Sequence, residues 1–327
     1  MKHNYKITTI LLTIFLLSQL IGIGLLYLTI DKQKSIDSGK TEFKDLALQE
    51  RPQLEEQTSY IPIIIMVFIG TILLLILIKF KLFIVWKIWY LLAIMTTLTT
   101  SFAVIIQPTI AIILAVILGL WKVFKPNIYI HNFTELFIYP AIALLFVPVI
   151  NLFSITMLLI LISIYDAYAV WKSKHMVTLA ESQTKAQLFA GLYIPYNSKQ
   201  GMPGSTSKTH ITNPTTHSTS STTHSSKTTS ATTTTTKITP SQHTTTTTQE
   251  TRTAVLGGGD IAFPLLFTGV MLKLYGLNAA LIVPIFTTIA LALLFFYGKP
   301  NRYYPAMLFI SAGCAVSYGV IYLLHFI

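Results

Sequence analysis

The sequence predicts an all-α integral membrane protein. Hydrophobic residues make up 53% of its 327 residues and charged residues only 11%, whereas charged residues are about a quarter of an ordinary soluble protein. The apolar residues also gather in runs about as long as a membrane-spanning helix, which needs about 20 residues. Both observations indicate a chain that crosses the bilayer many times.

Nine apolar spans account for these runs. The stretch 82–121 is about twice the length of one span, and we divide it near Gln107 and Pro108. The expected spans are 7–30, 61–78, 82–107, 108–121, 133–149, 152–171, 255–275, 278–297 and 304–326. The first follows basic residues like a signal peptide, but its apolar part is too long and no cleavage site follows, so we expect it to be retained.

Three segments organise the chain. Residues 1–190 hold the first six spans and a polar outer loop at 31–60, and residues 254–327 hold the last three spans. Between them, residues 191–253 become rich in Thr and Ser, with runs at 232–236 and 244–248. This composition buries too little apolar surface to form a core, so we expect a disordered loop.

The charged residues predict the orientation in the membrane. The formal net charge is +11, but the basic residues lie at the ends of apolar runs and not on one basic domain, so we expect no nucleic-acid partner. With the amino terminus inside, the inner segments hold most of the Lys and Arg, as the positive-inside rule requires. We therefore expect a multi-pass protein of the cell membrane, with loop 191–253 in the cytoplasm and the carboxyl terminus outside.

Two carboxylates lie inside expected spans beyond the first turn, Asp166 in the sixth and Asp260 in the seventh. A charge at a helix centre costs about 2.5–3.5 kcal/mol on insertion scales and usually marks a function. At about 1.5 Å per residue, Asp166 lies roughly 9 Å from Lys172, and Asp260 lies roughly 12 Å from Arg252. Because these spans run in opposite directions, the two carboxylates fall at similar depth and can face each other.

A facing pair of carboxyl groups predicts aspartyl-protease chemistry. The two groups do not both ionise cheaply, so they share a proton near neutral pH. Such a pair can take a proton from a water that attacks an amide carbon, and can protonate the departing nitrogen. Gly257, Gly258 and Gly259 directly before Asp260 would let an unwound substrate pair with the backbone. Close helix packing is the other explanation for these glycines.

Glu135 is a third carboxylate near a span. Asn132 at a helix start and Glu135 three residues later resemble a capping box. We therefore assign Glu135 a structural role and expect the fifth helix to start next to Asn132.

The motifs resemble the presenilin and signal peptide peptidase family of intramembrane aspartyl proteases, and most closely its archaeal presenilin homologues. Three pieces carry the resemblance: Tyr165-Asp166 with Lys-Ser-Lys-His-Met downstream, Gly257-Gly-Gly-Asp260 for the GxGD motif, and Pro305-Ala306-Met307 for the Pro-Ala-Leu motif. In successive spans these pieces are specific together, and the resemblance covers most of the chain.

The resemblance implies nine spans, catalytic roles for Asp166 and Asp260, and transmembrane helices of other proteins as substrates. It also implies that seven residues shape the active site, namely Tyr165, Gly257, Gly258, Gly259, Pro305, Ala306 and Met307. Met307 replaces the leucine of the motif, and we expect tolerance because the two side chains have similar volumes. No metal or other cofactor is implied.

A proton-coupled transporter or channel is the alternative, because intramembrane carboxylates also mark ion paths. Transporters often contain repeated halves with matching broken helices, whereas here the carboxylates gather in one pair of spans. The sequence names neither the physiological substrate and its cleavage position nor an accessory subunit.

Overall fold

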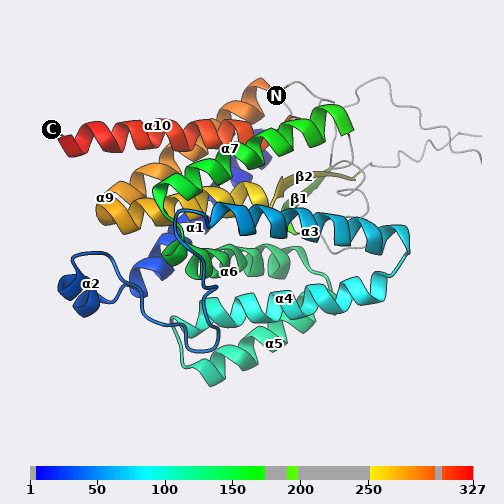
Figure 1. Ribbon diagram of the computed structural model, residues 1–327. Coiled ribbons are helices and arrows are strands. Elements are labelled where there is room, and N and C mark those ends of the chain that lie inside the picture. The colour runs from blue at the N-terminus through cyan, green and yellow to red at the C-terminus, as the bar shows by residue number, and fades with distance from the viewer. Residues whose placement is uncertain (1–4, 174–189, 198–250, 299–303, 327) are drawn as a thin grey trace, which may run out of the picture. The chain divides into compact units, whose positions relative to one another are not determined.

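The computed structural model describes residues 5–173, 190–197, 251–298 and 304–326, which are mostly helical (Figure 1). Seven of the described helices are long and apolar enough to cross a membrane. They are α1 (Tyr5–Leu28), α3 (Tyr60–Lys79), α4 (Phe83–Ala103), α6 (Ile128–Phe146), α7 (Leu152–Tyr168), α9 (Gly259–Tyr297) and α10 (Ala306–Phe326). Helix α7 reaches this length because a π-helical turn, Ala169–Ser173, continues it, so that the span runs from Leu152 to Lys172. Helix α5 (Pro108–Phe124) is apolar but shorter, and α2 (Lys32–Ser38) lies in the polar segment after α1.

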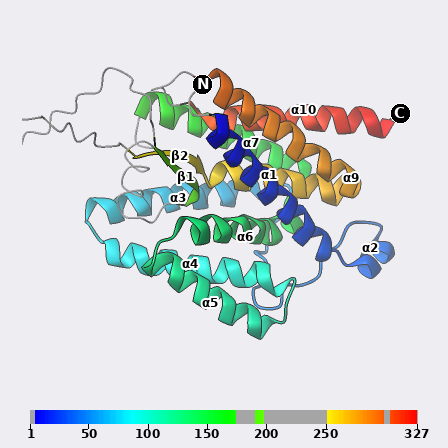
Figure 2. The same cartoon turned by 180° about the vertical axis from the view of Figure 1, so that it is seen from behind.

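The predicted seventh and eighth spans form the two halves of α9. Gly276 interrupts this helix with φ 82° and ψ −173°, a backbone conformation that glycine adopts without steric cost. The first half runs away from the strand β2, and the second half returns beside α10 (Figures 1 and 2). The predicted boundary between 275 and 278 is confirmed. The count of nine crossings stays a prediction, because α5 has only 17 residues and a span needs about 20.

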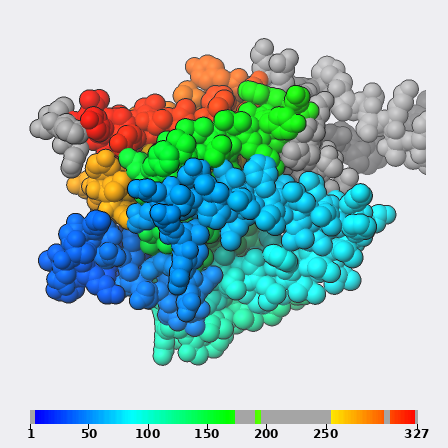
Figure 3. All heavy atoms as spheres, viewed as in Figure 1, coloured from blue at the N-terminus to red at the C-terminus, as the bar shows by residue number. Residues whose placement is uncertain are grey.

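One face of helix α1 is buried against the bundle, whereas α3 buries only two of its side chains. Helix α1 packs against α6 and α9, and its Leu11, Phe15 and Leu26 are almost completely buried. A Cβ on Gly22 would lie 2.4 Å from a methyl carbon of Leu265, so glycine is needed for α1 and α9 to approach this closely. By contrast, only Ile63 and Leu77 of α3 are buried, and this helix lies across the front of the space-filling view (Figure 3).

Two short strands, β1 (Gly191–Asn197) and β2 (Thr251–Gly257), form a sheet that the sequence analysis does not predict. The Gly258 N–H donates to the Ala190 carbonyl at 3.2 Å, so the strands run in opposite directions. The predicted seventh helix is wrong at its start: residues 255–257 belong to β2, and helix begins only at Gly259. Glycines cost about 1 kcal/mol each in a helix interior, which favours the late start.

The remaining part of the predicted loop, residues 198–250 with its Thr and Ser runs, lies outside the described residues. Disorder of this segment therefore stays a prediction. The described helices, together with residues 191–196 and 253–257, belong to one compact unit.

Helix α6 begins at Ile128, earlier than predicted. Its cap is Asn127, whose side chain accepts a hydrogen bond from the Tyr129 N–H at 2.9 Å. Asn132 and Glu135 lie inside the helix, so the capping-box interpretation is wrong. Asn127 has the extended backbone of an N-cap residue, so the helix starts directly after it. Asn132 and Glu135 are therefore free of a capping role and can contact other elements.

The two ends of the bundle differ. Helix α2, the break in α9 and the end of α10 lie at one end, and the strands lie at the other (Figures 1 and 2). At the first end, the Lys273 ammonium donates to Glu56 at 2.8 Å and to the Pro148 carbonyl at 2.9 Å. Which end faces the cytoplasm stays a prediction.

Candidate active site

Asp166 lies in the last turn of α7 and is almost fully buried, with 7% of its surface exposed. Its Oδ2 accepts a hydrogen bond from the Met307 backbone N–H at 3.2 Å. Met307 is the second residue of α10, and the N–H groups of a first helical turn have no partner within their own helix. Asp166 therefore caps α10 and joins the end of α7 to the Pro305-Ala306-Met307 segment.

A serine pair strengthens this junction. The Ser163 hydroxyl lies 2.8 Å from the Ser311 hydroxyl and 3.3 Å from the Met307 carbonyl. Ser163 precedes Asp166 by three residues, so both side chains lie on the same face of α7. In the sequence, only the spacing of three residues from Asp166 marks this serine, and we did not predict its role.

Asp260 lies in the first turn of α9, at the end of the glycine run. The backbone N–H of Gly257 donates a hydrogen bond to its carboxylate. A Cβ on Gly257 would lie 3.2 Å from Oδ2 of Asp260, so a side chain at 257 would crowd the carboxylate. The first turn of a helix also stabilises a negative charge through the aligned peptide dipoles.

The structure brings the two aspartates to the same place. Helix α7 packs against α9, and the charge of Asp166 acts on the carboxyl group of Asp260. The predicted depth of Asp260 used the helical rise from Arg252, which is wrong for residues 252–257 because they lie in β2 and a strand rises about 3.3 Å per residue. The two aspartates come together because α7 ends beside the start of α9. Asp166 lies in the last turn of α7, and Asp260 lies in the first turn of α9.

The three glycines before Asp260 have different surroundings. A Cβ on Gly258 would lie 2.9 Å from the hydroxyl oxygen of Tyr139, whereas a Cβ on Gly259 would lie at an ordinary 3.6 Å from the Phe263 ring. Close approach therefore explains Gly257 and Gly258, but it does not explain Gly259.

The other predicted residues border this site. The Tyr165 ring packs edge-on against Phe68 of α3, with 5.1 Å between ring centroids. Pro305 is buried directly before α10, a place where its missing N–H leaves no hydrogen bond unmade. Ala306 is the first residue of α10, and Met307 is buried with 3% exposed.

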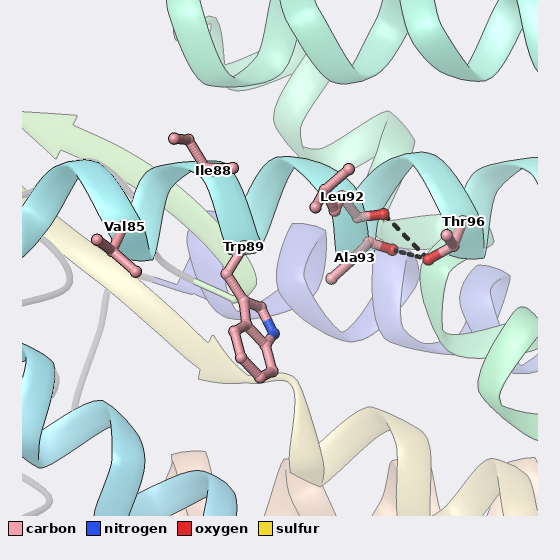
Figure 4. A pocket seen from close by; sticks show the side chains of 6 residues that line it. All are labelled: Val85, Ile88, Trp89, Leu92, Ala93 and Thr96. Atoms are coloured by element: carbon pink, nitrogen blue, oxygen red, sulfur yellow. Dashed lines mark hydrogen bonds between the residues drawn. The ribbon is translucent and has the colours of Figure 1, made fainter.

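A cavity of about 560 Å³ lies beside the glycine run. Its lining is mostly apolar and comes from α3, α4, α6 and the start of α9, with Gly258 and Gly259 among the lining residues. Ala93 also lines a second, neighbouring pocket on α4 (Figure 4). There the Thr96 hydroxyl bonds to the carbonyls of Leu92 and Ala93, so this pocket is apolar although it contains a threonine.

Helix α1 reaches the site through Gln19. Its side-chain amide donates to the Ile261 carbonyl at 2.9 Å, and Gln19 is fully buried. This contact fixes the backbone directly after Asp260. A polar residue in the middle of an apolar run was a signal for it in the sequence. In the part of the chain that the structure describes, no group of three or more His, Cys, Asp or Glu side chains could hold a metal ion.

The fold and this site together define a helical membrane protein with two carboxylates at facing helix ends. The family described as signal-peptide peptidase, presenilin aspartyl protease matches residues 12–326. The chain therefore belongs to this family of intramembrane aspartyl proteases, as the sequence motifs predict, and it is an aspartic protease of the multi-pass membrane type.

Two solved structures of a presenilin family intramembrane aspartate protease are similar to the chain. One, in space group C222, has a TM-score of 0.54 and 15% identity, and covers 95% of this chain and 94% of that one. The other, in space group P2, has the same score and identity, with 96% coverage of both chains. At this identity the likeness concerns the fold. A comparison with curated proteins finds no match.

Proposed function

We propose that Asp166 and Asp260 are the catalytic dyad of an endopeptidase that hydrolyses peptide bonds within transmembrane helices. One observation carries the proposal: the two carboxylates lie in the last turn of α7 and the first turn of α9, two helices that pack against each other. A backbone N–H holds each of them, from Met307 and from Gly257. Two preorganised carboxylates are the groups that hydrolysis through an activated water requires.

The proposed reaction uses one proton shared by the dyad. The ionised carboxylate takes a proton from the water while the water oxygen attacks the amide carbon. The protonated partner then gives its proton to the amide nitrogen as the carbon–nitrogen bond breaks. Because the pair titrates jointly, the rate should follow a bell-shaped curve against pH. A flat rate from about pH 4 to about pH 8 would contradict the mechanism.

We propose that the substrate lies in the 560 Å³ cavity beside Gly258 and Gly259, with its helix unwound near the dyad. The outward edge of β1 is already occupied, since Asn132 bonds to both the N–H and the carbonyl of Tyr193. A substrate strand would therefore pair with β2. Tyr165 and the Pro305-Ala306-Met307 segment border the dyad and would shape the site.

The expected topology completes the proposal. The amino terminus and the 191–253 loop face the cytoplasm and the carboxyl terminus faces outside, because the basic residues follow that pattern. With the amino terminus of a substrate helix outside, its carboxyl-terminal half would lie near β2. Substrate and partners would meet the protein from the bilayer, and no metal or nucleic acid is needed.

The test is reconstitution of the full chain in lipid vesicles with a labelled transmembrane reporter helix. Mass spectrometry should find products cut inside the reporter span, and a pH-sensitive dye inside the vesicles should report no protein-dependent proton flux. Proton flux without cleavage would overturn the protease and favour a proton-coupled transporter.

A further inference from the structure

Helices α5 and α6 contain a buried polar cluster that takes no part in the proposed proton transfers, although two of its residues, Glu135 and Tyr139, also line the 560 Å³ cavity. Its members are Lys122, Glu135 and Tyr139, which are 3%, 1% and 4% exposed. Removing an ion pair from water has a cost of several kcal/mol per ion, and packing with apolar residues would often serve stability as well. The location of the cluster suggests a role beyond stability.

Each oxygen of the Glu135 carboxylate has its own partner. The Lys122 ammonium lies 2.5 Å from Oε1, and the Tyr139 hydroxyl donates to Oε2. The ring of Tyr139 is therefore held in place. If it moved away, a buried carboxylate oxygen would lose its donor, and an unpaired buried charge is costly.

The held ring lies directly against the glycine run. A Cβ on Gly258 would come 2.9 Å from the Tyr139 hydroxyl oxygen and 3.0 Å from a ring carbon, Cε1, closer than side chains normally approach. Tyr139 and the backbone at 258 therefore interlock, and position 258 must be glycine as long as the ring cannot move.

The backbone at Gly258 sets the start of the helix that carries Asp260. The Gly258 carbonyl accepts hydrogen bonds from Ile261 at 3.2 Å and from Ala262 at 2.9 Å, the first bonds of α9. A shift at Gly258 would therefore turn Asp260 relative to Asp166. Misplacement of a reacting group by about 1 Å can lower a rate about a hundredfold.

Helix α6 also holds the strand that pairs with this loop. His131 Nε2 lies 2.8 Å from the Gly191 carbonyl oxygen, and the Asn132 side chain bonds to the Tyr193 backbone. His131, Glu135 and Tyr139 are spaced by four residues, so they share one face of α6. This second observation makes α6 the helix that holds both β1 and the glycine run.

We propose that Tyr139, held by Glu135 and Lys122, is a positioning residue that fixes the Gly258 backbone and thereby aims the Asp260 carboxylate. The inference rests on the proposed catalytic role of Asp260. It also explains the middle glycine of the Gly257-Gly258-Gly259 run, a position that the GxGD pattern leaves open.

The experiment is a double-mutant cycle in reconstituted vesicles with the cleavable reporter helix. Gly258→Ala adds one methyl group against the held ring and should lower kcat about 10- to 100-fold, with KM changed less than about twofold. Tyr139→Phe, which frees the ring from Glu135, should lower kcat by a similar factor. In the Tyr139→Phe background the closest contact, the hydroxyl oxygen, is gone, and the ring is no longer bonded to Glu135, so it can turn away from the added methyl. Gly258→Ala should then lower kcat further by less than about threefold.

Controls separate positioning from general stability. Rates are expressed per folded protein, with thermal unfolding and size-exclusion profiles measured for each variant. Gly24→Ala in α1 is the matched control, because no atom lies within 4 Å of its added Cβ, and it should leave kcat unchanged. If Tyr139 only stabilised the fold, Tyr139→Phe would lower the unfolding temperature and leave kcat per folded protein unchanged.

The outcomes are distinguishable. Equal losses from Gly258→Ala in both backgrounds, or full activity of Gly258→Ala, overturn the positioning role. Asp260→Ala is measured in the same series: if it cleaves like the unmodified protein, the proposed function itself fails. An inactive Asp260→Ala with additive effects of Gly258→Ala and Tyr139→Phe would remove only the role of Tyr139.

Discussion

Asp166 and Asp260 occupy one site, but the molecule holds them differently. Asp166 lies at the end of a packed helix and bonds to the start of another, with Ser163 and Ser311 bonded beside it. Asp260 follows a strand and a glycine run, and its carboxylate bonds to the Gly257 backbone. Contacts between helices therefore fix the first carboxylate, and the conformation of a short backbone segment fixes the second.

The difference has a functional meaning in the proposed mechanism. The cavity lies beside Gly258 and Gly259, on the side of Asp260. The backbone that aims Asp260 would be the backbone that a substrate strand approaches. We therefore expect substitutions in the glycine run to affect catalysis more than substitutions around Asp166 that leave its main-chain hydrogen bond in place.

The largest effect should come from the carboxylates themselves. Asp166→Ala and Asp260→Ala should each lower the cleavage rate by at least about a thousandfold, since each removes a group that transfers a proton. Cleavage of the reporter helix by purified protein in vesicles is the measurement. Equal losses in the two variants would show that both carboxyl groups are equally required, although the protein holds them by different contacts.

Gly257→Ala should have the next largest effect. Its Cβ would lie 3.2 Å from the Asp260 carboxylate and would turn that group, so kcat should fall about 10- to 100-fold. Gly24→Ala serves again as the control for an added methyl group. If Gly257→Ala keeps the full kcat, the carboxylate does not depend on the backbone beside it, and the contrast between the two sides fails.

Ser163→Ala tests the Asp166 side and should act more weakly. It removes the hydrogen bonds to Ser311 and to the Met307 carbonyl, each with a net value of about 1 kcal/mol. The unfolding temperature should fall by a few degrees and kcat by about fivefold at most. Thr156→Val is a matched loss of a hydroxyl that bonds only within α7. A hundredfold loss of kcat in Ser163→Ala would show that the helix junction is as sensitive as the glycine run.

Met307→Leu should have the smallest effect, less than about twofold in kcat/KM. Asp166 bonds to the backbone N–H of residue 307, which leucine keeps, and the two buried side chains have similar volumes. Side-by-side cleavage rates of the two proteins check this. A large loss would mean that the thioether of Met307 contacts the substrate.

The sequence predicted the parts of the site that have a strong local signal. Asp166 and Asp260 stand out because a carboxylate in an apolar span is costly, and Gly276 falls in the gap left between two apolar runs. The helices that carry them follow from apolar length alone. The family match over residues 12–326 agrees with these motifs.

The remaining parts depend on long-range contacts. Strand β1 is held by His131 and Asn132, about 60 residues earlier in the chain, and no local pattern marks that pairing. Asn132 and Glu135 matched a capping box by spacing, but Asn132 bonds to Tyr193 of β1, and Glu135 bonds to Lys122 of α5 and to Tyr139 of its own helix. Gln19 bonds to a carbonyl 242 residues away. Such contacts form only when the helices pack, so they cannot be predicted from the composition or the periodicity of the sequence.

The central claim is that Asp166 and Asp260 act together on one water. The most direct measurement compares Asp166→Asn, Asp260→Asn and the double variant in the vesicle cleavage assay, since asparagine keeps the shape of the side chain and removes its acid–base function. Groups that act as one unit lose nearly the full rate at the first substitution, so the double variant should be no slower than either single variant. A double variant slowed by the product of the two single losses, or a single variant that cleaves at the normal rate, would contradict the dyad.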